Sequence, residues 1–160
     1  MKKILLTIIT LFSITALNAN TTDSLYVSNE QYTHEILFIN TQNKLESLIQ
    51  DLENLDFSMQ WSINRLMIYT VDKKHRKDYD LLDAYIQHYN VSWDLFNSIQ
   101  RKKEAVKNYA TIVINSRLLI KEEIDLIYSC FTVIDEKEKS VKNSFNLYKL
   151  TIIAYEDNKK

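Results

Sequence analysis

The sequence predicts an all-α protein that folds as an elongated, antiparallel three-helix bundle running up, down and up. Two observations carry this prediction. The 160 residues contain no glycine and no proline, the residues on which tight hairpins, phosphate-binding loops and sharp turns depend. Apolar residues also recur at alternating spacings of three and four along three long stretches, the pattern of helices that pack against one another.

The first stretch carries two apolar rows with heptad spacing. One row consists of Phe38, Leu45, Leu52, Met59 and Leu66, and the other of Leu48, Leu55 and Tyr69, with Thr41 and Ser62 as polar interruptions. Further apolar residues lie beside these rows, namely Leu37, Ile49, Ile63 and Ile68. They widen the stripe beyond the narrow seam of a two-stranded coiled coil, which favours a bundle.

The second stretch follows a charged segment that has no apolar residue between Val71 and Tyr79. Its apolar row consists of Leu82, Tyr85, Tyr89, Phe96, Ile99, Val106, Ala110 and Val113, with Ser92 and Lys103 as polar exceptions. The segments Asn90-Val-Ser92 and Arg101-Lys-Lys103 leave open a break that would split this helix and give four helices in all. A polar cluster at 115–117 is expected to end it.

The third stretch is the most regular. Its row consists of Ile124, Ile127, Phe131, Ile134, Val141, Phe145, Tyr148, Ile152 and Tyr155, and Glu138 is its one polar member. A carboxylate is costly to bury without a cation, and Lys103 and Arg117 both interrupt the second row. Because the midpoints of neighbouring antiparallel helices lie close together, we expect Lys103 to contact Glu138 and to fix the register of the two helices.

Residues 1–19 have the pattern of a secretory signal peptide. Lys2 and Lys3 precede the apolar stretch 4–17, which is shorter than the ~20 residues needed to span a bilayer, and Ala19 suits cleavage. We therefore expect an exported protein, periplasmic or extracellular, with at most peripheral membrane contact. Residues 20–29 are expected to be a flexible lead-in, 30–156 the helical bundle domain and 157–160 a frayed C-terminus.

Charge and motif content argue against several functional classes. Without Lys2 and Lys3 the chain has 18 basic and 21 acidic residues, a net charge of −3, which does not favour nucleic acid as a partner. The three histidines and the lone Cys130 lack the spacings of di-iron, zinc-protease or c-type haem sites. The sequence therefore predicts no enzyme activity, cofactor or metal. Cys130 either packs as a small buried hydrophobe or cross-links two chains.

Two groups of residues are candidates for contact with a partner. The first is the basic run Lys73, Lys74, His75, Arg76 and Lys77. It would form a positive knob for lipid headgroups, an acidic glycan or an acidic protein, unless it only keeps the turn solvated. The second group is Trp61, Trp93 and Tyr109, which fall beside the apolar rows. They either pack on the flanks of the bundle or anchor a partner protein.

The expected function is that of a non-catalytic, exported helical interaction protein, a subunit or accessory factor of a bacterial envelope assembly. In its leader and helical layout the chain is similar to the small helical periplasmic or pilus-tip subunits of conjugative secretion systems. We expect protein partners in the envelope or at the cell surface, and a homo-oligomer is also open. The alternatives are a periplasmic binding or chaperone module, which needs a cavity or exposed apolar surface, and an immunity protein that neutralises a toxin through an acidic or aromatic patch.

Overall fold

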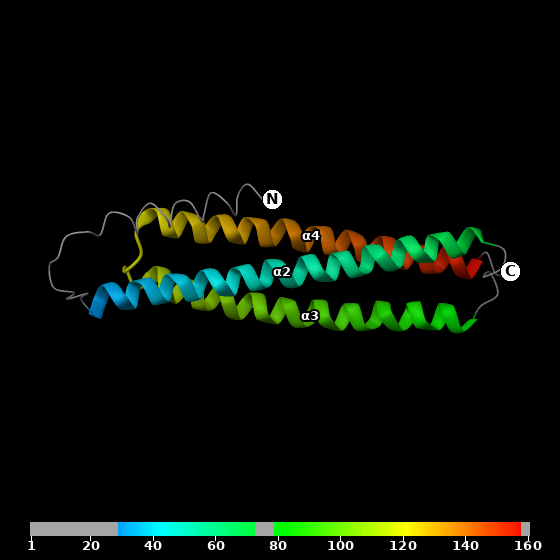
Figure 1. Cartoon of the computed structure of the whole chain (residues 1–160), viewed down its shortest axis with the longest axis horizontal. Helices are drawn as coiled ribbons and strands as arrows, with labels where there is room; N and C mark the ends of the chain where they lie inside the picture. Colours follow the sequence, from blue (N-terminus) through cyan, green and yellow to red (C-terminus); the bar gives the residue numbers. More distant parts are fainter. Residues whose placement is uncertain (1–28, 73–78, 158–160) are drawn as a thin grey trace, which may run out of the picture.

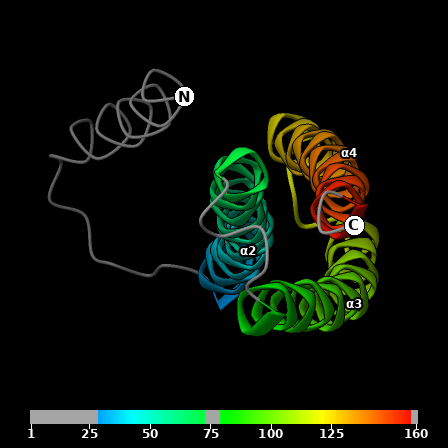
Figure 2. The ribbon, with the colours of Figure 1, turned by 90° about the vertical axis from the view of Figure 1, so that its right-hand side faces the viewer.

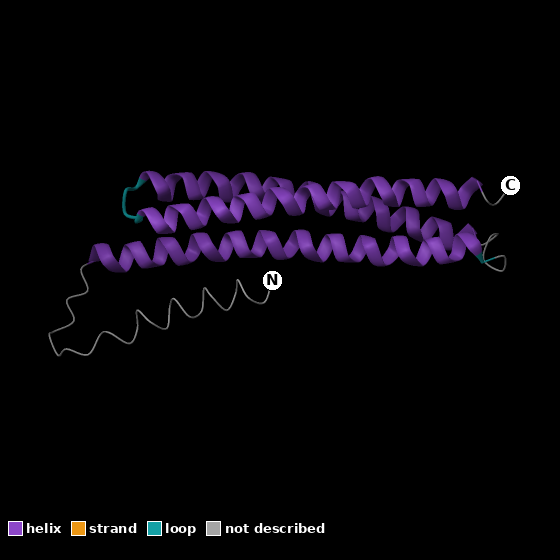
Figure 3. Ribbon diagram, turned by 90° about the horizontal axis from the view of Figure 1, so that it is seen from above, coloured by secondary structure: helices purple, strands orange, loops and turns teal. Residues whose placement is uncertain are grey.

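A computed structural model, which describes residues 29–72 and 79–157, contains three long helices lying side by side (Figure 1). They are α2 (Asn29–Val71), α3 (Tyr79–Asn115) and α4 (Lys121–Asp157). α2 and α4 run in the same direction and α3 runs in the opposite direction, so the predicted up-down-up bundle is confirmed. No strand occurs in the described part of the chain (Figure 3).

The helices begin and end close to the expected bounds of the bundle. α2 starts at Asn29, one residue before the expected domain, and α4 ends at Asp157, one residue beyond it. Differences of one residue are within the usual spread at helix ends. The expected signal peptide, the rest of the lead-in and residues 158–160 lie outside the described residues.

The second helix is not split. α3 continues without interruption through residues 90–92 and 101–103, so the four-helix alternative is wrong. Serine and lysine have only moderately lower helix propensity than alanine, and neither removes a backbone hydrogen bond as proline does. Ser92 is small enough to be buried in the bundle, and the ammonium group of Lys103 reaches acidic partners at the helix surface.

The core follows the predicted rows through the middle of the bundle. Side chains with no more than 1 % of their surface exposed come from all three helices: Leu45, Leu48, Leu52, Met59, Ile63, Leu66, Ala110, Ile127, Ile134, Val141, Tyr148 and Tyr155. The buried hydroxyl of Thr41 donates a hydrogen bond to the carbonyl oxygen of Leu37 at 2.7 Å. This bond offsets the cost of a polar group in the row.

Some residues of the predicted rows are less buried than expected. Ile124, Phe131 and Ile152 on α4 are only half-buried, because the pairing of α3 with α4 is the least extensive of the three helix pairings. Ile68 on α2 is 61 % exposed, so it does not widen the core stripe as its position suggested. In the view along the bundle, α2 lies beside α4 on one side and α3 on the other (Figure 2).

α2 and α4 approach each other through small polar residues near their centres. The carboxylate of Asp56 accepts hydrogen bonds from Ser140, at 2.8 Å, and from Ser144. Gln60 Nε2 donates to Ser144 Oγ at 2.7 Å. Serine side chains take little room, so two helices can pack closely there, and α2 and α4 form the most extensive helix pairing in the bundle.

The connection from α3 to α4 shows how a chain without glycine ends a helix. Arg117 has a φ of 61°, in the left-handed region that glycine usually occupies after a helix. Here an arginine adopts it, at a cost of about 1–2 kcal/mol. Ser116 Oγ donates to the carbonyl oxygen of Val113 at 2.6 Å, which satisfies one of the last carbonyl groups of α3.

None of the described helices combines the length and the apolar character that crossing a bilayer requires.

Candidate functional site

Lys103 and Glu138 lie together between α3 and α4, as the interrupted rows suggested. Lys103 Nζ is 2.6 Å from Glu138 Oε2, and both side chains are largely buried. Lys103 Nζ also lies 2.7 Å from Asp135 Oδ1, and Lys142 pairs with the other oxygen of Glu138. Arg117, the other cation considered for Glu138, lies in the connection after α3.

Burial and pairing act in opposite directions on the two charges. Burial works to raise the pKa of Glu138, but the hydrogen bonds from Lys103 and Lys142 outweigh it and leave the pKa below its usual value. Burial works to lower the pKa of Lys103, but Asp135 and Glu138 raise it overall. Both groups are therefore charged at neutral pH, and the network is suited to holding α3 and α4 in register rather than to exchanging protons.

The three aromatic side chains expected beside the core differ in their surroundings. The ring of Trp93 packs edge to face on Phe145, with centroids 5.1 Å apart. Tyr109 is half-buried beneath Lys44, whose Nζ lies 5.3 Å from the ring centroid. Both therefore pack on the flank of the bundle. Trp61 is 54 % exposed, and the guanidinium of Arg65 stacks on its ring at 4.8 Å.

The basic run Lys73, Lys74, His75, Arg76 and Lys77 lies outside the described residues. Cys130 is half-buried, and burial raises the pKa of its thiol. In the ranges 29–72 and 79–157, no three His, Cys, Asp or Glu side chains come together as a metal-binding cluster would require.

His88 forms a network that sequence patterns did not indicate. Its Nε2 lies 3.1 Å from Ser58 Oγ and its Nδ1 lies 3.2 Å from the hydroxyl of Tyr148. That hydroxyl donates its proton to the carbonyl oxygen of Tyr85 at 3.1 Å. In neutral His88, Nδ1 must therefore carry the proton and donate to Tyr148, while Nε2 accepts from Ser58. The network joins all three helices.

Burial governs the titration of the His88 network. It lowers the pKa of His88, because the charged imidazolium loses solvation. It raises the pKa of the Tyr148 hydroxyl to about 12, which keeps that group protonated as a donor. A Ser–His contact is part of a hydrolytic triad, but here Nδ1 faces a phenol rather than a carboxylate. The backbone N–H groups near Ser58 and His88 lie within continuous helices, so they are engaged and cannot serve as an oxyanion hole.

We expect His88 to make the protein less stable in mild acid. Its pKa in the folded state lies below the unfolded value near 6.5. Between these values the unfolded chain binds more protons, so stability is full above about pH 6.5 and falls as the pH drops toward the folded pKa. Thermal melts at pH 7.5 and 5.5 should show this loss. The loss should be smaller in His88→Gln, and an equal loss in both proteins would contradict the assignment.

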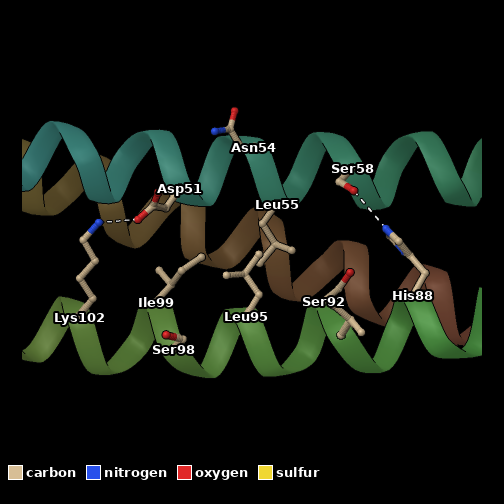
Figure 4. A pocket seen from close by; sticks show the side chains of 11 residues that line it. Asp51, Asn54, Leu55, Ser58, His88, Ser92, Leu95, Ser98, Ile99 and Lys102 are labelled. Atoms are coloured by element: carbon tan, nitrogen blue, oxygen red, sulfur yellow. Dashed lines mark hydrogen bonds and ion pairs between the residues drawn. The ribbon is translucent and has the colours of Figure 1, made fainter.

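The surface beside His88 is a groove between α2 and α3 (Figure 4). Leu55, Leu95 and Ile99 lie between the two helices, and an ion pair of 2.6 Å joins Asp51 to Lys102 across them. The remaining lining is mainly hydroxyl and amide groups. The ion pair and the Ser58–His88 bond bridge the two helices, so the principal polar groups of this groove are already used within the bundle.

A second exposed surface is apolar and lies over α2 and α4. We call it the α2/α4 face. Its groove is lined by Met67, Val71, Leu147, Leu150 and Ala154, and Phe57, Trp61 and Ile68 are exposed on α2 outside that groove. Its large side chains are between 38 % and 75 % exposed. Met67, Val71 and Leu150 line a groove between the two helices whose walls are almost entirely apolar. Of the sequence-predicted site residues that the structure describes, only Trp61 belongs to it.

On both helices, most of the exposed residues of the α2/α4 face belong to a row with heptad spacing that contains no charged residue. On α2 the outward row is Phe57, Trp61, Asn64, Ile68 and Val71, and on α4 it is Asn143, Leu147, Leu150 and Ala154. Both rows alternate steps of three and four, which is the spacing of a helix that packs on another helix. This spacing was visible in the sequence as a row beside the core.

The sequence matches no family model, and no curated protein or solved structure is significantly similar to it.

Proposed function

We propose that the protein is a non-catalytic, exported interaction protein that works as a subunit or accessory factor of an assembly in a bacterial cell envelope, such as a secretion or conjugation apparatus. The leader pattern of residues 1–19 supports export. The α2/α4 face supports an interaction function, because monomeric proteins seldom expose a contiguous apolar surface of this kind without a use for it. This face is the observation that carries the proposal.

Two features make a protein helix the expected ligand of the α2/α4 face. A groove between two parallel helices, walled by Met67, Val71 and Leu150, offers the shape into which an amphipathic helix packs. The exposed ring of Trp61 is of the residue type that most often anchors protein interfaces. The principal polar and charged groups described elsewhere on the bundle are already paired within it.

Capture of partners from the native envelope tests this function, with Ile68→Lys as the disruptive variant. Ile112→Lys is a matched control, because both isoleucines lie three residues before a helix end and are 61 % and 70 % exposed. We expect a defined set of envelope proteins to co-purify with the wild type and with Ile112→Lys, and at least tenfold less with Ile68→Lys. Equal recovery with all three proteins would exclude the face as the docking surface.

Export has its own test. The mass of the protein isolated from its host should place the N-terminus at or near Asn20. A full-length chain retained in the cytoplasm would contradict the envelope location.

A chaperone is the second candidate, because exposed apolar surface is also what binds unfolded clients. The two functions differ in selectivity. A chaperone would suppress the aggregation of unrelated unfolded proteins in proportion to its concentration, whereas an assembly subunit would leave them unaffected and retain a fixed partner.

A further inference from the structure

The two outward rows of the α2/α4 face offer no charged residue to attract a partner of opposite sign. None of their nine residues is Asp, Glu, Lys or Arg. The nearest cation on α2, Arg65, is turned back onto Trp61 and onto the hydroxyl of Tyr69, to which its Nε donates at 3.2 Å. A lipid surface or a strongly charged protein would require an excess of one sign on this face. The surface fits a partner that is itself uncharged and apolar.

We propose that the first occupant of the α2/α4 face is a second copy of this chain, packed face to face about a two-fold axis. The inference rests on the proposed function, because it names a ligand for the same docking surface. A two-fold interface requires a surface that is its own complement. The spacing of the two rows meets this requirement, because alternating steps of three and four residues give the same pattern along a helix in either direction. The rows also meet it in charge, because two uncharged surfaces do not repel each other.

Polar residues within the rows support pairing between copies. Asn64 and Asn143 are both exposed. Asn64 stands within the otherwise apolar row of α2, and Asn143 stands at the start of the row of α4. An asparagine amide has donors and an acceptor, so it can hydrogen-bond to another asparagine. In helical interfaces a single asparagine in an apolar seam selects the register and the number of chains, at some cost in stability.

The size of the face indicates a weak dimer. Residues 57–71 of α2 extend about 22 Å at 1.5 Å per residue, and two adjacent helices are about 20 Å wide. The face therefore covers on the order of 400 Å² on each copy, about half of the ~800 Å² that stable complexes bury per partner. We expect a dissociation constant in the micromolar range or weaker, so the dimer should form only as the concentration rises.

Sedimentation velocity of the purified protein, in the processed form that the cell produces, tests this inference between about 1 and 500 µM. We expect the wild type and Ile112→Lys to shift from monomer to dimer over this range. Ile68→Lys should need at least tenfold more protein for the same shift, because each dimer would place two ammonium groups against apolar surface. Far-UV circular dichroism and thermal melts should show that both variants keep the wild-type fold, since both positions are exposed.

The outcomes that overturn the dimer differ from those that overturn the proposed function. A wild-type protein that stays monomeric at 500 µM, or a dimer that Ile68→Lys leaves unchanged, excludes the second copy as the occupant. After either of these results, the docking function would still be upheld if Ile68→Lys recovered fewer envelope partners than the wild type in the capture experiment. Binding of the monomer to phosphatidylglycerol vesicles, abolished in Ile68→Lys, would assign the face to lipid instead.

Discussion

Replacing Phe145 with alanine is expected to lower the free energy of unfolding by about 3–5 kcal/mol. The ring is only 3 % exposed and lies among aromatic rings of α3, with centroids 5.6 Å from Tyr89, 5.1 Å from Trp93 and 5.6 Å from Phe96. Rigid rings cannot collapse into the space that the substitution leaves, and the edge-to-face contacts are lost as well. At about 2–4 °C per kcal/mol, the melting temperature should fall by roughly 10 °C.

Phe131→Ala is the matched comparison on the same helix. Its ring is half-buried and lines the groove between α3 and α4, so the loss should be about 1–2 kcal/mol. Urea titrations of both variants would measure the difference. Equal losses, or a loss below about 1 kcal/mol for Phe145→Ala, would mean that the aromatic contacts contribute little.

Glu138→Leu and Lys103→Leu are each expected to destabilise the protein by about 2–3 kcal/mol. Each change leaves a largely buried charge short of a partner. Glu138→Leu leaves Lys103 only Asp135, whose side chain is 67 % exposed, and Lys103→Leu leaves Glu138 only Lys142, which is 58 % exposed. The double variant removes both buried charges and should recover most of the loss.

A double-mutant cycle of these variants measures their coupling. Asp135→Ala serves as the control and should cost less than about 1 kcal/mol, because its side chain is largely solvated. If Glu138→Leu proved neutral or more stable than the wild type, pairing with Lys103 would not be what fixes the register of α3 and α4. Losses that simply add in the double variant would lead to the same conclusion.

The bundle and its core could be predicted because both depend on local spacing. Residues seven apart, such as Leu45, Leu52 and Met59, face the same side of any helix, so their burial follows from periodicity alone. The pair of Lys103 and Glu138 was also accessible, since each interrupts an otherwise apolar row near the middle of its helix. The partial exposure of Phe131 could not be predicted, because the sequence does not show how closely α3 approaches α4.

The His88 network and the α2/α4 face were harder to predict, for different reasons. The His88 network joins residues 58, 88 and 148, and their meeting depends on the exact register of three helices. The α2/α4 face left a signal, the second heptad row from Phe57 to Val71. Of that row, only Ile68 was assigned to the core stripe, and Trp61 was left open between the flank of the bundle and a partner. An apolar row beside the core has the same spacing whether another helix of the chain covers it or not.

Three antiparallel helices carry the chain from one end of the rod to the other. The first residue of α2 and the last residue of α4 therefore lie at opposite ends (Figure 1), about 60 Å apart for helices of this length. An even number of helices would have brought them back together. Phe57 lies about 42 Å along α2 from Asn29. If the molecule were attached at the end of the rod where α2 begins, the α2/α4 face would therefore lie in the half of the rod farther from the attachment. In an assembly, such a rod sets a fixed distance between its point of attachment and its point of contact.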